Sequence, residues 1–307
     1  MAVAELATGR DAWAESLLLQ AVELAERNQD NFRAANLWLM ISIHSQSNQQ
    51  GSTETTAWHK AVDRHSMATQ DSGHPLNISF WVRADRQKPN NAKWPESTKK
   101  SLLPFAQSVG CKLTENSPNE LVIWSAIGNA QLSGGEPQLA LVNFKKAESF
   151  ATGEDVMWLR IAQGTCLAAL GQSRAAAALL SEPLASNRPV IAAAANAALG
   201  SAKLHAGTFQ QGAQLLNKAL AESPNLDWPN KSKAEADLAL AMLVIGETDQ
   251  GLKKLHLAQR KFEILGDSTS LLQSLENEMR LLRHEGKTNE AEKVQRRILR
   301  VEQTKAG

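Results

Sequence analysis

His59 and Asp63 form the pair of side chains that comes nearest to a metal site in this sequence. They lie one helical turn apart, so both would face the same side of a helix, and zinc accepts imidazole and carboxylate ligands. A zinc site needs a third protein ligand, and none follows at a matching spacing. We therefore interpret the two residues as a solvated surface pair and predict no metal site.

The two cysteines are the other candidates for covalent chemistry. Cys111, within SVGCKLT, has no neighbouring histidine to activate it, and Cys166 lies in an apolar helical pattern where a buried thiol is usually inert. The sequence also contains no G-x-S-x-G nucleophile elbow, no G-x-x-x-x-G-K-[ST] loop and no H-E-x-x-H pair. We expect no catalytic residues, no cofactor and no enzyme activity in this chain.

Composition and charge limit the remaining classes of function. The chain has 307 residues, of which 43% are hydrophobic and 21% charged, as in folded proteins. A formal charge of +1 provides no overall attraction to nucleic acid or acidic lipid. No apolar run is long enough to span a membrane, and no basic segment followed by an apolar one marks a leader. Together with the two unpaired cysteines, this favours a cytoplasmic protein without a membrane span.

The basic C-terminal segment KVQRRILRVEQTK is the one candidate for binding nucleic acid. Its cations suit a helix C-terminus, and a polar last helix is typical of the cap of a helical array. Three glutamates dilute the patch: Glu290, Glu292 and Glu302. We therefore predict that nucleic acid is not a partner.

Regularly spaced glycines indicate the elements that would position any functional side chain. Each of them follows a segment with a small or apolar helical stripe and precedes a segment with an alanine-bearing stripe: Gly9, Gly51, Gly135, Gly171, Gly207, Gly246 and Gly286. Neighbouring glycines in this set are 36 to 42 residues apart, except that Gly51 and Gly135 are separated by two steps of 42 residues. Such a period predicts repeated helical hairpins that stack on one another. In WSAIGNAQLSGGEPQLALVNFKKA, we expect Gly128 and Ala140 to let two antiparallel helices approach closely.

This pattern resembles the tetratricopeptide repeat. One unit matches at seven positions: Trp124, Ile127, Gly128, Gly135, Ala140, Phe144 and Ala147. The match covers residues 120–307 well and residues 1–66 loosely. The resemblance implies an all-α fold in which antiparallel helix pairs form a right-handed superhelical solenoid.

Residues 67–119 interrupt the pattern because they are rich in Pro, Asn and Ser. We expect an irregular insertion or a degenerate repeat there, with NISFWVRA as a short strand or helix and ESTKKSLLPFAQSVG as one helix. Residues 1–66 would then form an N-terminal helical block and residues 120–307 the main array. Because only eight residues precede Gly9, half a repeat is missing, and we expect the chain to be part of a longer protein or to have a misassigned start.

The resemblance further implies that the first helix of each pair lines a concave groove. The groove positions of the family correspond here to the following candidates for partner binding: Ser125, Asn129, Trp158, Ile161, Thr165, Ser201, Leu204, His205, Arg280 and Arg283. The residues of a carboxylate clamp are absent, since its positions hold Ala162, Ala194 and Ala198. The apolar positions have two interpretations, packing against the next repeat or a channel for a partner segment.

Two functions remain open on the sequence alone. The first is a non-enzymatic scaffold or adaptor that binds another protein or peptide segment in the groove. The second is the sensor or regulatory region of a larger enzyme or regulator whose catalytic domain is not in this chain.

Overall fold

The computed structural model describes residues 11–47, 51–71, 78–89, 92–114, 116–223, 228, 230–265 and 267–306. These residues form helices joined by turns and contain no strand, so the all-α prediction is confirmed. They divide into two compact units, which we call the N-terminal unit (Met1–Gln107 and Leu113–Ala130) and the C-terminal unit (Ser108–Lys112 and Gln131–Gly307).

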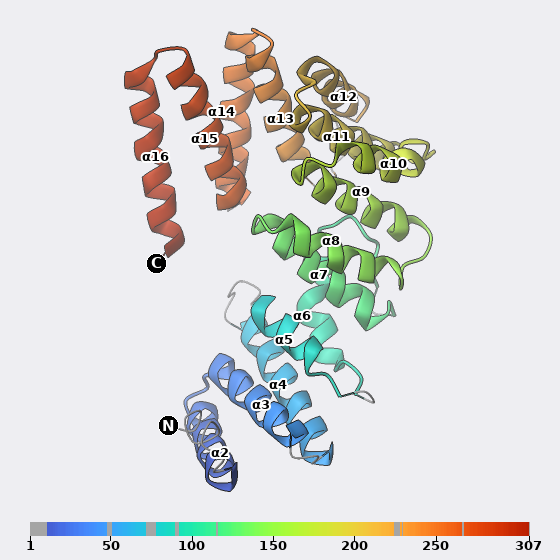
Figure 1. Ribbon diagram of the computed structural model, residues 1–307, viewed down its shortest axis with the longest axis vertical. Helices are drawn as coiled ribbons and strands as arrows, with labels where there is room; N and C mark the ends of the chain where they lie inside the picture. Colours follow the sequence, from blue (N-terminus) through green and yellow to red (C-terminus); the bar gives the residue numbers. More distant parts are fainter. Residues whose placement is uncertain are drawn as a thin grey trace. The chain divides into compact units, whose positions relative to one another are not determined.

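The helices follow one another along the chain (Figure 1). The N-terminal unit contains α2 (Asp11–Arg27), α3 (Asn31–Ser47), α4 (Gly51–Asp71), α5 (Ile78–Arg86), α6 (Glu96–Gln107) and most of α7 (Asn119–Ser133). The C-terminal unit contains α8 (Pro137–Glu148), α9 (Glu154–Ala169), α10 (Ser173–Leu184), α11 (Pro189–His205), α12 (Phe209–Glu222), α13 (Lys231–Val244), α14 (Thr248–Leu265), α15 (Ser268–His284) and α16 (Thr288–Ala306).

The C-terminal unit is an array of antiparallel helix pairs: α9 with α10, α11 with α12, α13 with α14, and α15 with α16. A glycine with positive φ closes each hairpin, at Gly171, Gly207, Gly246 and Gly286. Side chains other than glycine are strained in this backbone region, which explains why the glycine period predicts the hairpins. Gly135, just before α8, has the same conformation with φ 81°. Gly51 instead begins α4, and Gly9 lies outside the described residues.

The seam inside a hairpin is narrow because it is built on glycine. A Cβ atom added to Gly212 of α12 would lie 3.0 Å from the carbonyl oxygen of Gly200 in α11 and 2.4 Å from Leu204 Cδ2. In the pair α9 and α10, Gly164 of the first helix lies against Leu180 of the second, where an added Cβ would be 2.8 Å from Leu180 Cδ2. The corresponding contact of Gly128 with Ala140 stays a prediction, although Ala140 is fully buried.

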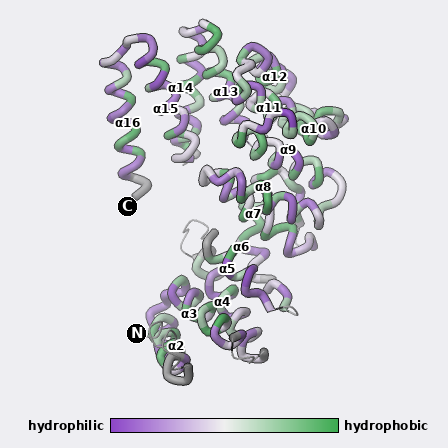
Figure 2. Tube along the Cα trace, viewed as in Figure 1, coloured by the Kyte–Doolittle hydropathy of each residue, from purple (hydrophilic) through white to green (hydrophobic). Residues whose placement is uncertain are grey.

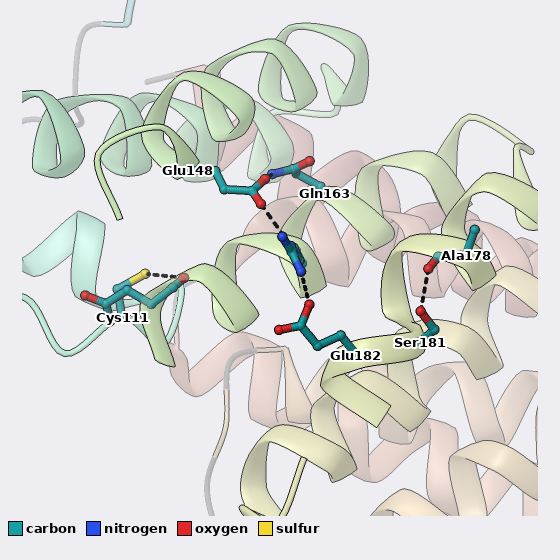
Figure 3. A network of polar contacts seen from close by, with 8 residues as sticks. Cys111, Glu148, Gln163, Ala178, Ser181 and Glu182 are labelled. Carbon is teal, nitrogen blue, oxygen red and sulfur yellow. Dashed lines mark hydrogen bonds and ion pairs between the residues drawn. The ribbon is translucent and has the colours of Figure 1, made fainter. Parts of the chain in front are cut away.

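Hydrophobic residues alternate with hydrophilic ones along the helices, so that each helix has an apolar side to pack and a polar side to expose (Figure 2). Polar side chains join neighbouring helices as well. Gln163 of α9 donates to Glu148 of α8 at 2.6 Å, and the guanidinium of Arg160 lies between Glu148 and Glu182 of α10 (Figure 3). These bonds satisfy the polar groups that the packing of the array removes from water.

Within segment 67–119, residues 78–86 are helical rather than a strand, and residues 96–107 are helical as ESTKKSLLPFAQSVG predicts. They form α5 and α6, and α4 continues to Asp71. Aromatic packing stabilises α5: Trp58, Phe80 and Trp81 are completely buried, and Trp58 Nε1 donates to the carbonyl of Ala84 at 2.8 Å. Burial of such large side chains outweighs the low helix propensity of the local composition.

Candidate binding groove

A groove of about 580 Å³ lies in the C-terminal unit along three helices that are each the first of a pair, α11, α13 and α15. Successive helices in the array are antiparallel, so these three run in the same direction. The lining residues are Ser201, Leu204, His205, Phe209, Lys233, Ala236, Asp237, Leu240, Ala241, Leu243, Val244, Phe262, Ser270, Gln273, Ser274, Asn277, Arg280 and Leu281.

The side of the groove formed by α11 and α13 is mainly apolar. Leu204 and Leu240 are half-buried, and Ala236 and Leu243 are almost completely buried. Phe262, from α14, is 3% exposed. These residues therefore form an apolar surface that remains open to solvent at the leucines.

The side formed by α15 is polar. Ser270, Gln273, Ser274 and Asn277 recur at intervals of three and four residues and so share one face of the helix. Within the described residues none of the four side chains forms a hydrogen bond with the protein, and Ser274 is unusual because its hydroxyl is also buried. Buried hydroxyls are normally hydrogen-bonded, so this side of the groove holds unused hydrogen-bonding capacity.

Basic side chains lie toward both ends of the groove. Lys233 is in the first turn of α13, and His205 and Arg280 lie near the C-terminal ends of α11 and α15. Arg280 contacts Glu276 at 3.6 Å, with both side chains exposed, and such a pair contributes little. The carboxylate of Asp237 accepts a hydrogen bond from Ser201. The groove thus presents two permanent cations and one carboxylate that is already held by the protein.

Four of the residues suggested by the sequence lie together in this groove, namely Ser201, Leu204, His205 and Arg280. Arg283 does not line it, and its guanidinium donates to Gln295 of α16 at 2.5 Å. The structure adds residues that the sequence did not suggest as binding residues, among them Phe209, Phe262, Ser270, Ser274 and Asn277. The even spacing of the polar residues on α15 is the one sequence signal that points to them.

The candidates on α9 are placed differently. Trp158 is 5% exposed and packs under Gly110, where an added Cβ would lie 2.5 Å from the indole ring. Ile161 is also buried, and the hydroxyl of Thr165 donates to the carbonyl of Ile161 at 3.0 Å. The segment that covers Trp158 is held in place because the backbone N–H of Lys112 donates to Asp155 at 2.7 Å. The apolar residues of α9 therefore pack within the unit.

The two remaining candidates belong to the N-terminal unit. Ser125 is completely buried in α7, so its side chain is not accessible to a partner. Asn129 is more exposed, and its side-chain amide donates to the carbonyl of Phe105 at 3.4 Å. The groove in the C-terminal unit is formed without either residue.

The side chains considered for metal or covalent chemistry have structural roles. His59 Nε2 lies 3.2 Å from the carbonyl of Lys93, and Asp63 accepts a hydrogen bond from Ser97. Burial raises the pKa of the Cys111 thiol, and it raises the pKa of Cys166 to about 12, so both thiols are protonated at neutral pH. Within the residues that the structure describes, no three His, Cys, Asp or Glu side chains gather as metal ligands.

No protein-family model matches the chain, and no curated protein does. Among solved structures the chain is similar to a monomeric mutant of IFIT1 with m7Gppp-AAAA, at 15% sequence identity and a TM-score of 0.41, over 97% of this chain and 67% of that one.

The IFIT1 structure requires one correction. That protein was solved with a capped oligonucleotide, so the exclusion of nucleic acid from the partners of this chain is wrong. The physical reason is that net charge averages over the whole surface, whereas a ligand is bound by the charges of one site. The expectation about the membrane is separate: no helix among the described residues is long and apolar enough to cross one.

Proposed function

We propose that this chain is a non-enzymatic binding scaffold of the tetratricopeptide type, and that the groove along α11, α13 and α15 holds a segment of a partner protein. The observation that carries the proposal is the groove itself, in which an apolar wall faces a polar helix. Its volume of about 580 Å³ lies within the usual range for binding sites, about 300–1,000 Å³. A groove of mixed character suits a polypeptide, which carries both apolar side chains and polar backbone groups.

The inner position of these helices also supports a recognition role. Their neighbours α12, α14 and α16 close the hairpins and form the cores with Leu216, Leu255 and Ile298, which leaves the groove side of α11, α13 and α15 open. Hairpins repeated in this way hold side chains from three helices at fixed positions, so the site is preorganised for its partner.

A photo-cross-linking experiment tests this function. The photoreactive residue benzoylphenylalanine replaces Gln273, which is exposed in the groove, or Gln211, also an exposed glutamine, on α12 as the matched control. After irradiation in native lysate, we expect protease-sensitive adducts from position 273 and few from position 211. Adducts that only a nuclease removes, or equal adducts from both positions, would contradict a protein-binding groove.

A further inference from the structure

We infer that the occupant of the groove is an extended peptide segment of about five residues, with alternate apolar side chains and acidic groups toward its ends. This inference rests on the proposed function and adds the conformation and the charge of the partner. It follows from the unpaired polar face of α15, from the length of the groove and from the positions of its cations.

The polar face of α15 matches the needs of an extended backbone. Serine hydroxyls and the amides of Gln and Asn can both donate and accept hydrogen bonds. An extended segment has unpaired N–H and C=O groups, whereas an α-helix satisfies its own. Elsewhere in the array, buried amide side chains already have protein partners: Asn143 donates to Gln131 at 2.6 Å and Gln259 to Glu278 at 2.7 Å. The unpaired face of α15 is therefore available to a ligand backbone.

The buried hydroxyl of Ser274 is a second, independent observation that supports an extended ligand. Its side chain is 3% exposed, lies among the residues that line the groove, and has no hydrogen-bond partner within the described residues. A buried hydroxyl without a partner is unfavourable for the free protein, and a backbone group of an incoming segment can relieve that cost. An amphipathic helix has no free backbone group in its middle to offer, so it would leave Ser274 unpaired.

The length of the groove sets the size of the segment. Along α13 the groove extends from Lys233 to Val244. At a rise of 1.5 Å per residue this distance is about 16 Å, which corresponds to about five residues of extended chain. In such a segment alternate side chains point to opposite sides, so one set faces the leucines of α11 and α13 while the backbone follows α15.

The cations fix the charge of the segment. Lys233 forms no ion pair among the described residues, Arg280 forms only an exposed one, and they lie toward opposite ends of the groove. Asp237, the one acidic residue among the described lining residues, accepts a hydrogen bond from the Ser201 hydroxyl of α11. Carboxylates near both ends of the segment would therefore meet a cation, while a basic segment would meet like charge.

Selection from a phage-displayed library of random twelve-residue peptides on the full chain tests the inference. We expect enriched peptides with apolar residues at every second position over about five residues, flanked by Asp or Glu. Their affinity should fall about tenfold for the Asn277→Ala variant and for a backbone N-methylated copy of the peptide, because each change removes hydrogen bonds to the ligand backbone. Asn289→Ala, an exposed asparagine on α16, is the control and should bind as the wild type does.

The charge requirement is tested with the same peptides. Arg280→Gln and Lys233→Gln should each weaken binding about three- to tenfold at low salt, and the matched exposed variants Arg296→Gln and Lys253→Gln should not. Circular dichroism of each variant confirms that the fold is retained.

The possible failures are distinguishable. Enriched peptides with apolar residues at helical spacing that depend on Leu240 but not on Asn277 would overturn the extended conformation and leave the proposed function standing. If no enriched peptide depends on any groove residue, the proposed function fails as well. Binding of m7Gppp-AAAA that requires Lys233 and Arg280, in the absence of peptide binding, would assign the groove to nucleic acid and overturn both.

Discussion

Replacement of Gly212 by alanine tests how the hairpin seam positions the groove. The added methyl group would lie 2.4 Å from Leu204 Cδ2 and 3.0 Å from the carbonyl oxygen of Gly200. The leucine side chain can rotate away, but the carbonyl belongs to the backbone of α11 and moves only with that helix. Leu204 lines the groove, so a shift of α11 changes the groove wall.

Two opposing effects set the expected change in the free energy of unfolding of Gly212→Ala. Alanine in place of glycine inside a helix stabilises by about 1 kcal/mol, and overpacking of a close seam costs about 1–3 kcal/mol. Because one of the close contacts is with backbone, we expect the cost to be greater and the free energy of unfolding to fall by about 1 kcal/mol. If the seam had room for the methyl group, the free energy of unfolding would instead rise.

Urea denaturation followed by far-ultraviolet circular dichroism measures this difference. Leu204→Ala makes room for the added methyl group, so the double variant should lose less stability than the two single variants together, by about 1 kcal/mol. Gln214→Ala, at an exposed position of α12, is the control and should change stability by no more than about 0.5 kcal/mol. A stabilised Gly212→Ala variant whose effect adds simply to that of Leu204→Ala would refute the close seam.

Two further predictions concern the core. Ala140→Leu should destabilise the chain by about 1–3 kcal/mol because Ala140 is completely buried, and an unchanged denaturation midpoint would show that its surroundings have room. His65 is fully buried, and burial together with the charge of Arg83 lowers its pKa from 6.5 to about 4. The unfolded chain therefore binds a proton that the folded chain does not, and the wild type should lose about 3 kcal/mol more stability than His65→Phe as pH falls from about 6.5 to about 4. If the stability of the wild type and of His65→Phe changed equally with pH, this prediction would be contradicted.

The hairpins of the C-terminal unit were predictable because their turns require glycine. Gly171, Gly207, Gly246 and Gly286 have positive φ, a conformation that selects glycine whatever surrounds it. The helix α5 was not predictable in the same way, because the sequence left both a strand and a helix open there. Phe80 and Trp81 are buried against residues distant in the sequence, such as His65 and Trp94, and local composition does not record such packing.

The groove was predictable in part from the resemblance to the tetratricopeptide repeat. The groove positions that the resemblance implies include Leu204 and Arg280, and both residues line the groove. Periodicity does not show that Gly110 covers Trp158, since that contact joins residues far apart in the chain. Nor does it show that Ser274 lacks a hydrogen-bond partner, because the absence of a partner is a property of the packed structure.

Hydrogen–deuterium exchange of the full chain, alone and with a captured partner, tests most directly that the groove is the binding surface. Binding should slow exchange in the residues of α11, α13 and α15 that line the groove, within 201–205, 233–244 and 270–281. The outer helix α12 should change little beyond its first residue, Phe209, which lines the groove. Protection confined to α12, α14 and α16, or to the N-terminal unit, would contradict binding in this groove.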